Sequence, residues 1–102
     1  MRVEFTKLAA ADLRQIALFI AGDSPVRAIE FVDELESAAR GLQNMPERFP
    51  ELFGSGDSAV RRRVYKAYSI FYRIEPNRVV ILRIVHGAAV SDDFLDDLSF
   101  AP

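Results

Sequence analysis

The spacing of hydrophobic residues divides the chain into two parts. Up to about residue 42, apolar side chains recur every three or four positions, whereas after Gly56 they recur at every second position. The first spacing places apolar side chains on one side of a helix, and the second places them on one face of a β-strand. The sequence therefore predicts a helical first half and a sheet-forming second half.

Two helices are expected in the first half, joined by the short sequence Gly-Asp-Ser-Pro at residues 22–25. Thr6 is placed to cap the first helix and Ser24 the second, with Pro25 in the first turn of the second helix. The apolar stripe of the first helix consists of Leu8, Leu13, Ile16, Phe19 and Ile20. The stripe of the second consists of Ile29, Val32, Leu35, Ala39 and Leu42. Because the connection is so short, we expect the two helices to lie antiparallel as a hairpin.

The second half predicts three strands, near residues 60–66, 68–75 and 78–86, with a turn at 75–78 between the last two. A short strand is expected at 2–5, the stretch 46–58 is expected to be irregular, and Ser91 with the aspartates after it favours a short helix over 91–98. The predicted fold is α+β with the order β-α-α-β-β-β, an N-terminal strand and helical hairpin packed on an antiparallel sheet. We expect one domain spanning residues 1–102.

The alternating pattern also predicts which face of the sheet the hairpin covers. The most consistently apolar set, expected beneath the hairpin, is Phe71, Val80, Leu82 and Ile84. The opposite face then presents Tyr68, Ile70, Tyr72, Val79, Ile81 and Arg83. An exposed apolar patch of this kind is typical of an interface, so we expect a partner to cover it.

The formal net charge of −2 conceals a strong segregation of charge along the chain. Residues 58–90 carry a balance of +6, whereas the segments before and after each carry −4. Three hypotheses fit the run Arg61–Arg63 and its neighbouring tyrosines: solubilising charges on an edge strand, a surface for an acidic protein, or a nucleic-acid grip. Because adjacent strand residues point to opposite faces, Arg61 and Arg63 are expected on one side and Arg62 on the other.

Composition excludes several kinds of site. The chain has no cysteine, so it forms neither a disulfide framework nor a thiolate metal site, and it shows no glycine-rich phosphate loop. We therefore expect no cofactor and no metal. The N-terminal residues lack the apolar run of a signal peptide and no stretch approaches a membrane span, which favours a cytoplasmic protein with no membrane partner.

The order of elements and four stretches resemble the ParE branch of the RelE/ParE superfamily, the toxins of bacterial type II toxin–antitoxin modules. The stretches are VEFTKLAAADLRQIALFIAGDSPVRAIEFVDELESA (3–38), FPEL (49–52), VRRRVYKAYSIFYRI (60–74) and VVILRIVHGA (79–88). The resemblance implies a small toxin neutralised by an antitoxin whose C-terminal segment wraps it. It further implies that ParE-like members poison DNA gyrase, whereas RelE-like members cut mRNA on the ribosome.

The C-terminal segment separates these two activities. RelE-like toxins carry basic residues and often a tyrosine here, whereas this chain has Ala88, Ala89, Val90 and Phe94. None of these side chains transfers a proton or stabilises a phosphate, so ribonuclease chemistry and any catalytic residue are not expected. His86, the single histidine, is a general-base candidate, but we interpret it as a residue that closes the last strand through a local hydrogen bond.

The resulting hypothesis is a non-catalytic toxin that inhibits DNA gyrase by protein–protein contact and forms a hetero-oligomer with a ParD-like antitoxin. Its antitoxin-binding candidates are Arg61, Arg63, Tyr68, Ile70, Tyr72, Ile81 and Arg83. Its gyrase-contact candidates are Phe94, Leu95 and Leu98. We expect an acidic and apolar antitoxin segment, and no direct sequence-specific binding of nucleic acid. The alternatives are a RelE-like ribosome-dependent mRNA endonuclease and an inactive binding module of the same fold.

Overall fold

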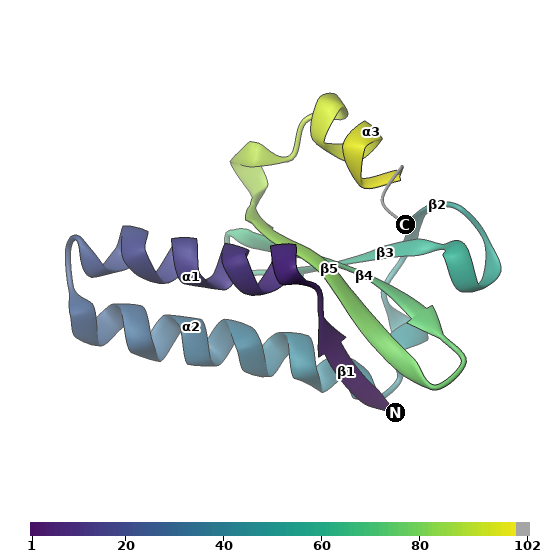
Figure 1. Cartoon of the computed structure of the whole chain (residues 1–102), viewed down its shortest axis with the longest axis horizontal. Helices are drawn as coiled ribbons and strands as arrows, with labels where there is room; N and C mark the ends of the chain where they lie inside the picture. The colour runs from purple at the N-terminus through teal and green to yellow at the C-terminus, as the bar shows by residue number, and fades with distance from the viewer. Residues whose placement is uncertain (100–102) are drawn as a thin grey trace.

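The chain folds into a five-stranded sheet with a helical hairpin on one face and a short helix on the other (Figure 1). The computed structural model describes residues 1–99. Its elements are β1 (Arg2–Phe5), α1 (Lys7–Ala21), α2 (Pro25–Arg40), β2 (Glu51–Phe53), β3 (Val60–Tyr65), β4 (Tyr68–Glu75), β5 (Arg78–His86) and α3 (Asp92–Ser99). The predicted α+β class and the predicted order of elements are confirmed.

The strands lie in the order β1-β5-β4-β3-β2. β2 to β5 pair antiparallel, whereas β1 pairs parallel to β5. The sheet is therefore mixed, where the sequence predicted an antiparallel one. β2 lies within the stretch that we expected to be irregular. It pairs with β3 only around Glu51 and Phe53, with an irregularity between them. A strand of three residues is too short to show an alternating pattern, which explains why the sequence did not reveal it.

The helix caps form as predicted. The Thr6 hydroxyl accepts a hydrogen bond from the Ala9 N–H at 3.0 Å and donates one to the Leu82 carbonyl at 2.9 Å, so the cap also ties α1 to β5. The Ser24 hydroxyl accepts from the Arg27 N–H at 3.3 Å at the start of α2. Each cap satisfies an N–H group that the first helical turn leaves unpaired. The two helices lie antiparallel, side by side (Figure 1).

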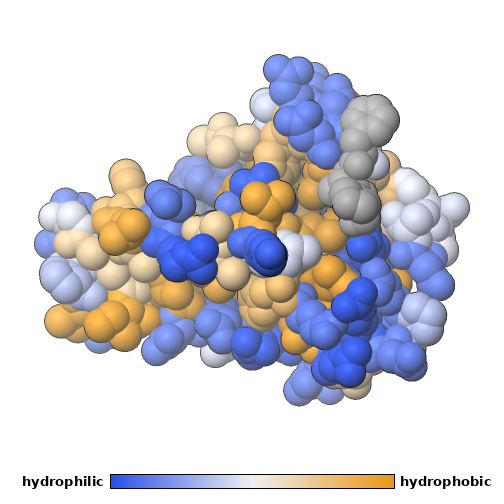
Figure 2. Space-filling view, in the orientation of Figure 1, coloured by the Kyte–Doolittle hydropathy of each residue, from blue (hydrophilic) through white to orange (hydrophobic). Residues whose placement is uncertain are grey.

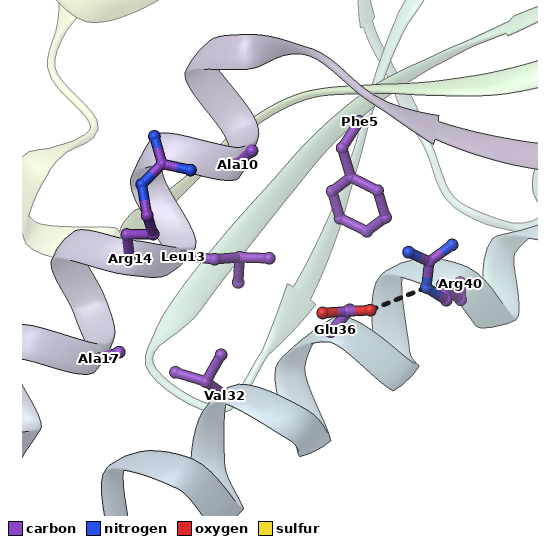
Figure 3. Close-up of a pocket in the computed structure, with 8 residues that line it drawn as sticks. All are labelled: Phe5, Ala10, Leu13, Arg14, Ala17, Val32, Glu36 and Arg40. Carbon is purple, nitrogen blue, oxygen red and sulfur yellow. Dashed lines mark hydrogen bonds and ion pairs between the residues drawn. The ribbon is translucent and has the colours of Figure 1, made fainter.

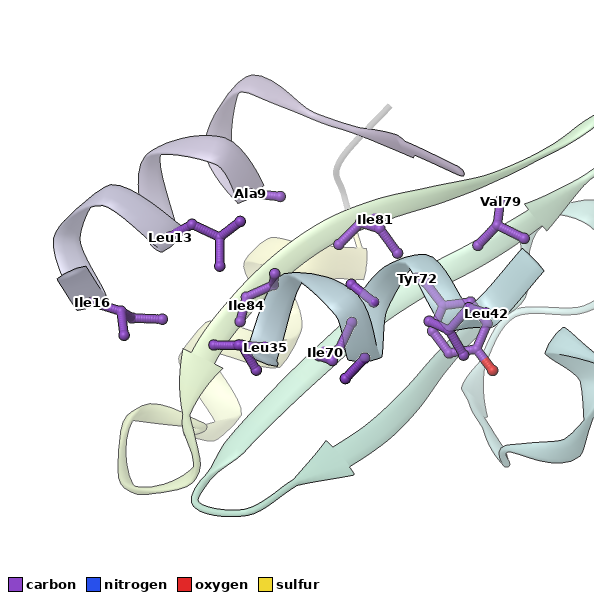
Figure 4. Packing of buried hydrophobic residues seen from close by; sticks show 12 residues of the cluster. Ala9, Leu13, Ile16, Leu35, Leu42, Ile70, Tyr72, Val79, Ile81 and Ile84 are labelled. Carbon is purple, nitrogen blue, oxygen red and sulfur yellow. The ribbon is translucent and has the colours of Figure 1, made fainter. Parts of the chain in front are cut away.

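The face beneath the hairpin is the reverse of the predicted one. Ile70, Tyr72, Val79 and Ile81, predicted to be exposed, are fully buried against Leu35 and its neighbours on the helices (Figure 4). Ile84 is the one residue of the predicted set that does face the hairpin. Ile84 differs from the rest of its set because β5 contains a bulge: Phe71 pairs with Arg83 while Tyr72 pairs with Ile81, so that Leu82 and Ile84 lie on opposite faces.

The second face is also buried. Phe71, Val80 and Leu82 form a second cluster with Val60 and with Leu98 of α3. A sheet covered on both faces has apolar side chains at consecutive positions. Its sequence pattern therefore does not indicate which face packs against the hairpin and which against α3.

We expect the core beneath the hairpin to dominate the stability of the fold. Leu35→Ala removes a side chain with no exposed surface and leaves a cavity, which should lower the free energy of unfolding by about 2–5 kcal/mol. Leu18→Ala is the matched control, because Leu18 is 67% exposed and its loss should change stability by less than about 0.5 kcal/mol. Urea unfolding of both variants measures the difference, and equal effects would contradict this assignment of the core.

The buried phenol of Tyr72 should make stability depend on pH in the alkaline range. Its hydroxyl donates to the Pro46 carbonyl at 2.6 Å, and burial raises the pKa of Tyr72 to about 12. Since an unfolded tyrosine ionises near pH 10, the folded state should lose stability between about pH 10 and 12. From pH 9 to pH 11.5, wild type should lose about 2 kcal/mol more than Tyr72→Phe in urea unfolding. An equal loss of unfolding free energy in the two proteins would show that the pKa of Tyr72 is not raised in the folded state.

Candidate partner-binding surface

Arg61 and Arg63 face the hairpin side of the sheet and are bound within the protein. Arg61 Nη1 donates to the carbonyls of Phe49 at 2.6 Å and Glu47 at 3.0 Å. Arg63 Nη1 donates to the Ala38 carbonyl near the end of α2 at 2.8 Å. These bonds fix the loop before β2 and the C-terminal turn of α2 against β3. Arg61 and Arg63, both predicted to contact the antitoxin, therefore hold parts of this fold together.

Arg62 takes the opposite face, as predicted. Its Nε donates to the Ser69 hydroxyl at 2.9 Å, and its guanidinium lies 5.6 Å from the centre of the Phe71 ring. The hypothesis of solubilising charges on an edge strand is wrong, because β2 pairs with the first residues of β3. The three consecutive arginines form part of the internal framework of the sheet.

Arg83 is bound most tightly of the predicted candidates. Its Nε and Nη2 donate to the two carboxylate oxygens of Asp12 at 2.8 and 2.9 Å. Asp12 also accepts a hydrogen bond from the Ile84 N–H at 2.8 Å. This bidentate pairing raises the pKa of the Arg83 guanidinium, which stays charged. One carboxylate thus joins α1 to the side chain and the main chain of β5 at its bulge.

The apolar antitoxin candidates are not on the surface. Ile70, Tyr72 and Ile81 are fully buried beneath the hairpin, and Tyr68 is half-buried with its ring centre 5.4 Å from that of Phe31. The prediction that a partner covers these side chains is wrong in this fold, because α1 and α2 cover them already.

The apolar side of α3 also faces inward. Leu98 is buried, and the ring centre of Phe94 lies 5.3 Å from that of Phe71 and 5.3 Å from the Arg83 guanidinium. Leu95 packs against the same cluster. The exposed side of α3 carries its four aspartates, Asp92, Asp93, Asp96 and Asp97. The predicted gyrase-contact residues Phe94, Leu95 and Leu98 therefore pack against the sheet, and the surface that α3 presents to solvent is acidic.

His86 ends β5 as the sequence predicted. Its Nδ1 accepts a hydrogen bond from the Ala88 N–H at 3.0 Å, and its ring meets the Tyr68 ring edge-on with centres 5.3 Å apart. Both rings line a hollow of about 520 Å³ beside α1. Asp12 is the one carboxylate among the described residues that line this hollow. Because Asp12 is held by Arg83, it offers no proton-accepting partner to His86. Residues 1–99 contain no cluster of His, Cys, Asp and Glu side chains that could hold a metal ion.

An ionic cluster that sequence reasoning missed holds the turn between β3 and β4. Lys66 adopts a left-handed conformation with φ of 53° and forms an ion pair with Glu34 of α2. The Tyr65 hydroxyl donates to the same carboxylate, and this hydrogen bond raises the pKa of Tyr65. Glu34 belongs to the polar side of the predicted helix, so no local pattern indicated its partners.

The exposed large hydrophobic residues lie mainly on the hairpin. They include Leu8 (59%), Leu18 (67%), Phe19 (81%), Val26 (64%) and Ile29 (67%). Three of them, Leu8, Phe19 and Ile29, were predicted to face the core. Alanines take their place beneath the helices, notably Ala9, Ala38 and Ala39. Figure 2 shows hydrophobic surface towards the end of the hairpin. Several large apolar side chains exposed on one hairpin are typical of a binding surface. The two helices contain more large apolar residues than one face accommodates. This excess is the sequence signal that could have revealed the exposed apolar surface.

The helices of the described segment, residues 1–99, are all too short or too polar to span a bilayer.

The fold is a small α+β domain whose helical hairpin exposes several large apolar side chains. The family model described as the ParE toxin of the type II toxin–antitoxin system, parDE, matches residues 3–90. The chain belongs to this family, and α3 follows the matched region.

Two solved structures show the same fold. A chain of the chromosomal ParDE TA system from P. aeruginosa is 24% identical, with a TM-score of 0.70, covering 84% of this chain and 95% of that one. A chain of the toxin–antitoxin complex RelBE2 from Mycobacterium tuberculosis is 26% identical, with a TM-score of 0.61, covering 85% and 91%. No curated protein matches the chain.

Removing the Asp12 carboxylate should destabilise the fold strongly. Asp12→Ala leaves Arg83, whose side chain is 29% exposed, and the Ile84 N–H without their partner, at a cost of about 2–4 kcal/mol. Asp12→Asn should cost less, because its amide oxygen still accepts from Ile84. Asp33→Ala, at an exposed carboxylate, is the control. Urea unfolding ranks the three, and an Asp12→Ala variant as stable as the control would exclude Asp12 as an anchor.

Proposed function

We propose that this protein is the toxin of a type II toxin–antitoxin module and inhibits DNA gyrase by protein–protein contact, without chemistry of its own. The observation that carries the proposal is that the cations of the basic segment are engaged inside the protein. Arg61, Arg62, Arg63 and Arg83 each hold a hydrogen bond or ion pair with another element or strand. A nuclease needs such cations free, to stabilise the phosphate that is being cleaved.

Membership of the ParE toxin family supports a role as a toxin. The exposed apolar residues of the hairpin support inhibition by protein–protein contact. The exposed residues Leu18, Phe19 and Ile29 offer apolar contact area. Gyrase acts on DNA in the bacterial cytoplasm, and we place the toxin there. α3 adds four exposed aspartates near the second face of the sheet, and we retain it as a secondary contact with gyrase.

The antitoxin is the second partner that we propose. Both structural relatives come from toxin–antitoxin systems by their titles. A ParD-like antitoxin neutralises the toxin by covering the exposed apolar residues of the hairpin with a segment that orders on binding. The toxin is then held in a hetero-oligomer and its contact surface is hidden from gyrase.

A RelE-like ribonuclease is the competing function, and the likeness to RelBE2 is the observation that favours it. Its acid–base group would be His86, with Tyr68 beside it. In the described structure, His86 Nδ1 is engaged by the Ala88 N–H. In the described part of the chain, the hollow that His86 and Tyr68 line contains no Lys or Arg side chain to stabilise the charge of a phosphate during cleavage.

An assay with purified toxin, freed of antitoxin, tests the proposal. The toxin should inhibit supercoiling by gyrase or trap cleaved plasmid, and it should leave mRNA on translating ribosomes intact. His86→Ala should retain at least about half of the inhibition, because the side chain is exposed and makes only a local hydrogen bond.

Codon-positioned mRNA cleavage that is lost in His86→Ala, with gyrase unaffected, would overturn the proposal in favour of the ribonuclease. If neither activity appears in cells without an antitoxin, the protein is an inactive binding module of the same fold.

A further inference from the structure

The hollow of about 520 Å³ beside α1 has mainly apolar walls and a few neutral polar groups. Ile16 and Phe19 of α1 line it together with Ile84 and Val85 of β5. Phe19 is 81% exposed, so its ring is accessible at the rim of the hollow. A hollow of this size, largely apolar with a few polar groups, is the usual form of a small-molecule site.

Three polar groups of the lining have no hydrogen-bond partner among residues 1–99. They are the Gln15 amide, the Tyr68 hydroxyl and Nε2 of His86. Gln15 and His86 are exposed. The described chain contains no buried side-chain polar atom without a partner, so the Tyr68 hydroxyl also reaches solvent. A ligand can therefore bind all three groups without breaking a bond of the fold.

The hydrogen bond to the main chain determines what His86 offers to a ligand. His86 Nδ1 accepts from the Ala88 N–H at 3.0 Å, so Nδ1 of the neutral ring carries no proton. The proton is then on Nε2, which is a donor. The Tyr68 hydroxyl is a second donor, and the Gln15 amide both donates and accepts. These groups suit a ligand that carries a carbonyl oxygen and an N–H.

The charge of the lining favours a neutral ligand. Among the described residues it contains no Lys or Arg, and its one carboxylate, Asp12, is held by Arg83 at 2.8 and 2.9 Å. The hollow of about 380 Å³ between α1 and α2 differs, because its polar residues are ionic (Figure 3). They are Arg14, Glu36 and Arg40, and Glu36 pairs with Arg40 at 2.9 Å.

The aromatic rings of the lining favour a flat ligand. The rings of Tyr68 and His86 meet at 81° with their centres 5.3 Å apart. A flat aromatic molecule that stacks on one of two perpendicular rings meets the other edge-on, and both arrangements are favourable. The exposed ring of Phe19 adds a third aromatic surface.

We propose that this hollow binds a neutral, planar aromatic molecule that carries an amide or lactam group. The aromatic part packs against Ile16, Phe19 and the rings of Tyr68 and His86. The carbonyl faces the donors of Tyr68 and His86, and the N–H faces the Gln15 amide. The site joins α1 to the end of β5, and it is independent of both gyrase and the antitoxin.

Three small compounds test the proposal on the toxin alone. Benzamide is the probe, because it is flat and neutral and carries a carbonyl and an N–H. Cyclohexanecarboxamide keeps the amide but has no flat ring, and benzoate keeps the flat ring but carries a negative charge. Titrations followed by amide NMR shifts measure the affinity and locate the bound compound.

Benzamide should bind with a Kd of about 1 mM, as expected for a ligand of about nine non-hydrogen atoms. Its shifts should centre on Gln15, Phe19 and Val85. The other two compounds should bind at least about fivefold more weakly, because one loses the ring stacking and the other must bury an unpaired charge.

Variants of the lining test its individual groups. Tyr68→Phe removes only the hydroxyl and Gln15→Leu removes the amide, and each should weaken benzamide binding about fivefold, the effect of one hydrogen bond. Ala89→Trp, at an exposed position of the lining, should fill the hollow and abolish binding. Gln43→Leu, at an exposed glutamine outside the hollow, is the matched control and should leave the affinity unchanged. Thermal unfolding checks that each variant folds.

The proposal is overturned if benzamide at about 10 mM, roughly ten times the expected Kd, shifts none of the amides of Gln15, Phe19 and Val85. It is also overturned if benzoate or cyclohexanecarboxamide binds as tightly as benzamide, or if Tyr68→Phe and Gln15→Leu bind benzamide as well as wild type does. The comparison of the three compounds uses the wild-type protein, so it decides the question even where a variant does not fold.

Discussion

The bidentate contact between Asp12 and Arg83 is the constraint on which the rest of the structure depends. It joins the first helix to the last strand across 71 positions of the chain, and the Ile84 N–H donates to the same carboxylate. It lies beside the bulge of β5, where it ties α1 to the sheet. Beyond the bulge, Ile84 turns to the hairpin side and joins the core that contains Ile70 and Ile81.

Three further arginines of the basic segment also form hydrogen bonds within the fold. Arg63 reaches the end of α2, Arg61 holds the loop before β2, and Arg62 lies across the second face. Arg61 and Arg63 satisfy carbonyl oxygens of a loop and of a helix end, and Arg62 donates to the Ser69 hydroxyl of β4. The cations of β3 and β5 are thereby used within the domain. The surface left for partners is the apolar one, along and between the two helices.

Local patterns predicted the elements well, because caps and turns are short-range features. Thr6, Ser24 and the turn at 75–78 could all be recognised from neighbouring residues. The assignment of the sheet faces could not be predicted, because both faces are apolar, and the bulge in β5 further moves Ile84 to the hairpin side. The site candidates failed for a related reason: the partners of Arg63 and Arg83 lie 25 and 71 positions away. The exposed Phe19 and Ile29 were predicted as core residues, since a binding surface on a helix has the same periodicity as a buried one.

We propose that this toxin acts through contact and not through cleavage. The most direct measurement is made in cells lacking antitoxin, shortly after induction of the toxin. Chromosomal breaks covalently linked to gyrase and new mRNA 5′ ends are mapped in the same sample. We expect gyrase-linked breaks to accumulate while the mRNA ends stay at the level of uninduced cells. New mRNA ends at fixed codon positions, without gyrase-linked breaks, would contradict it.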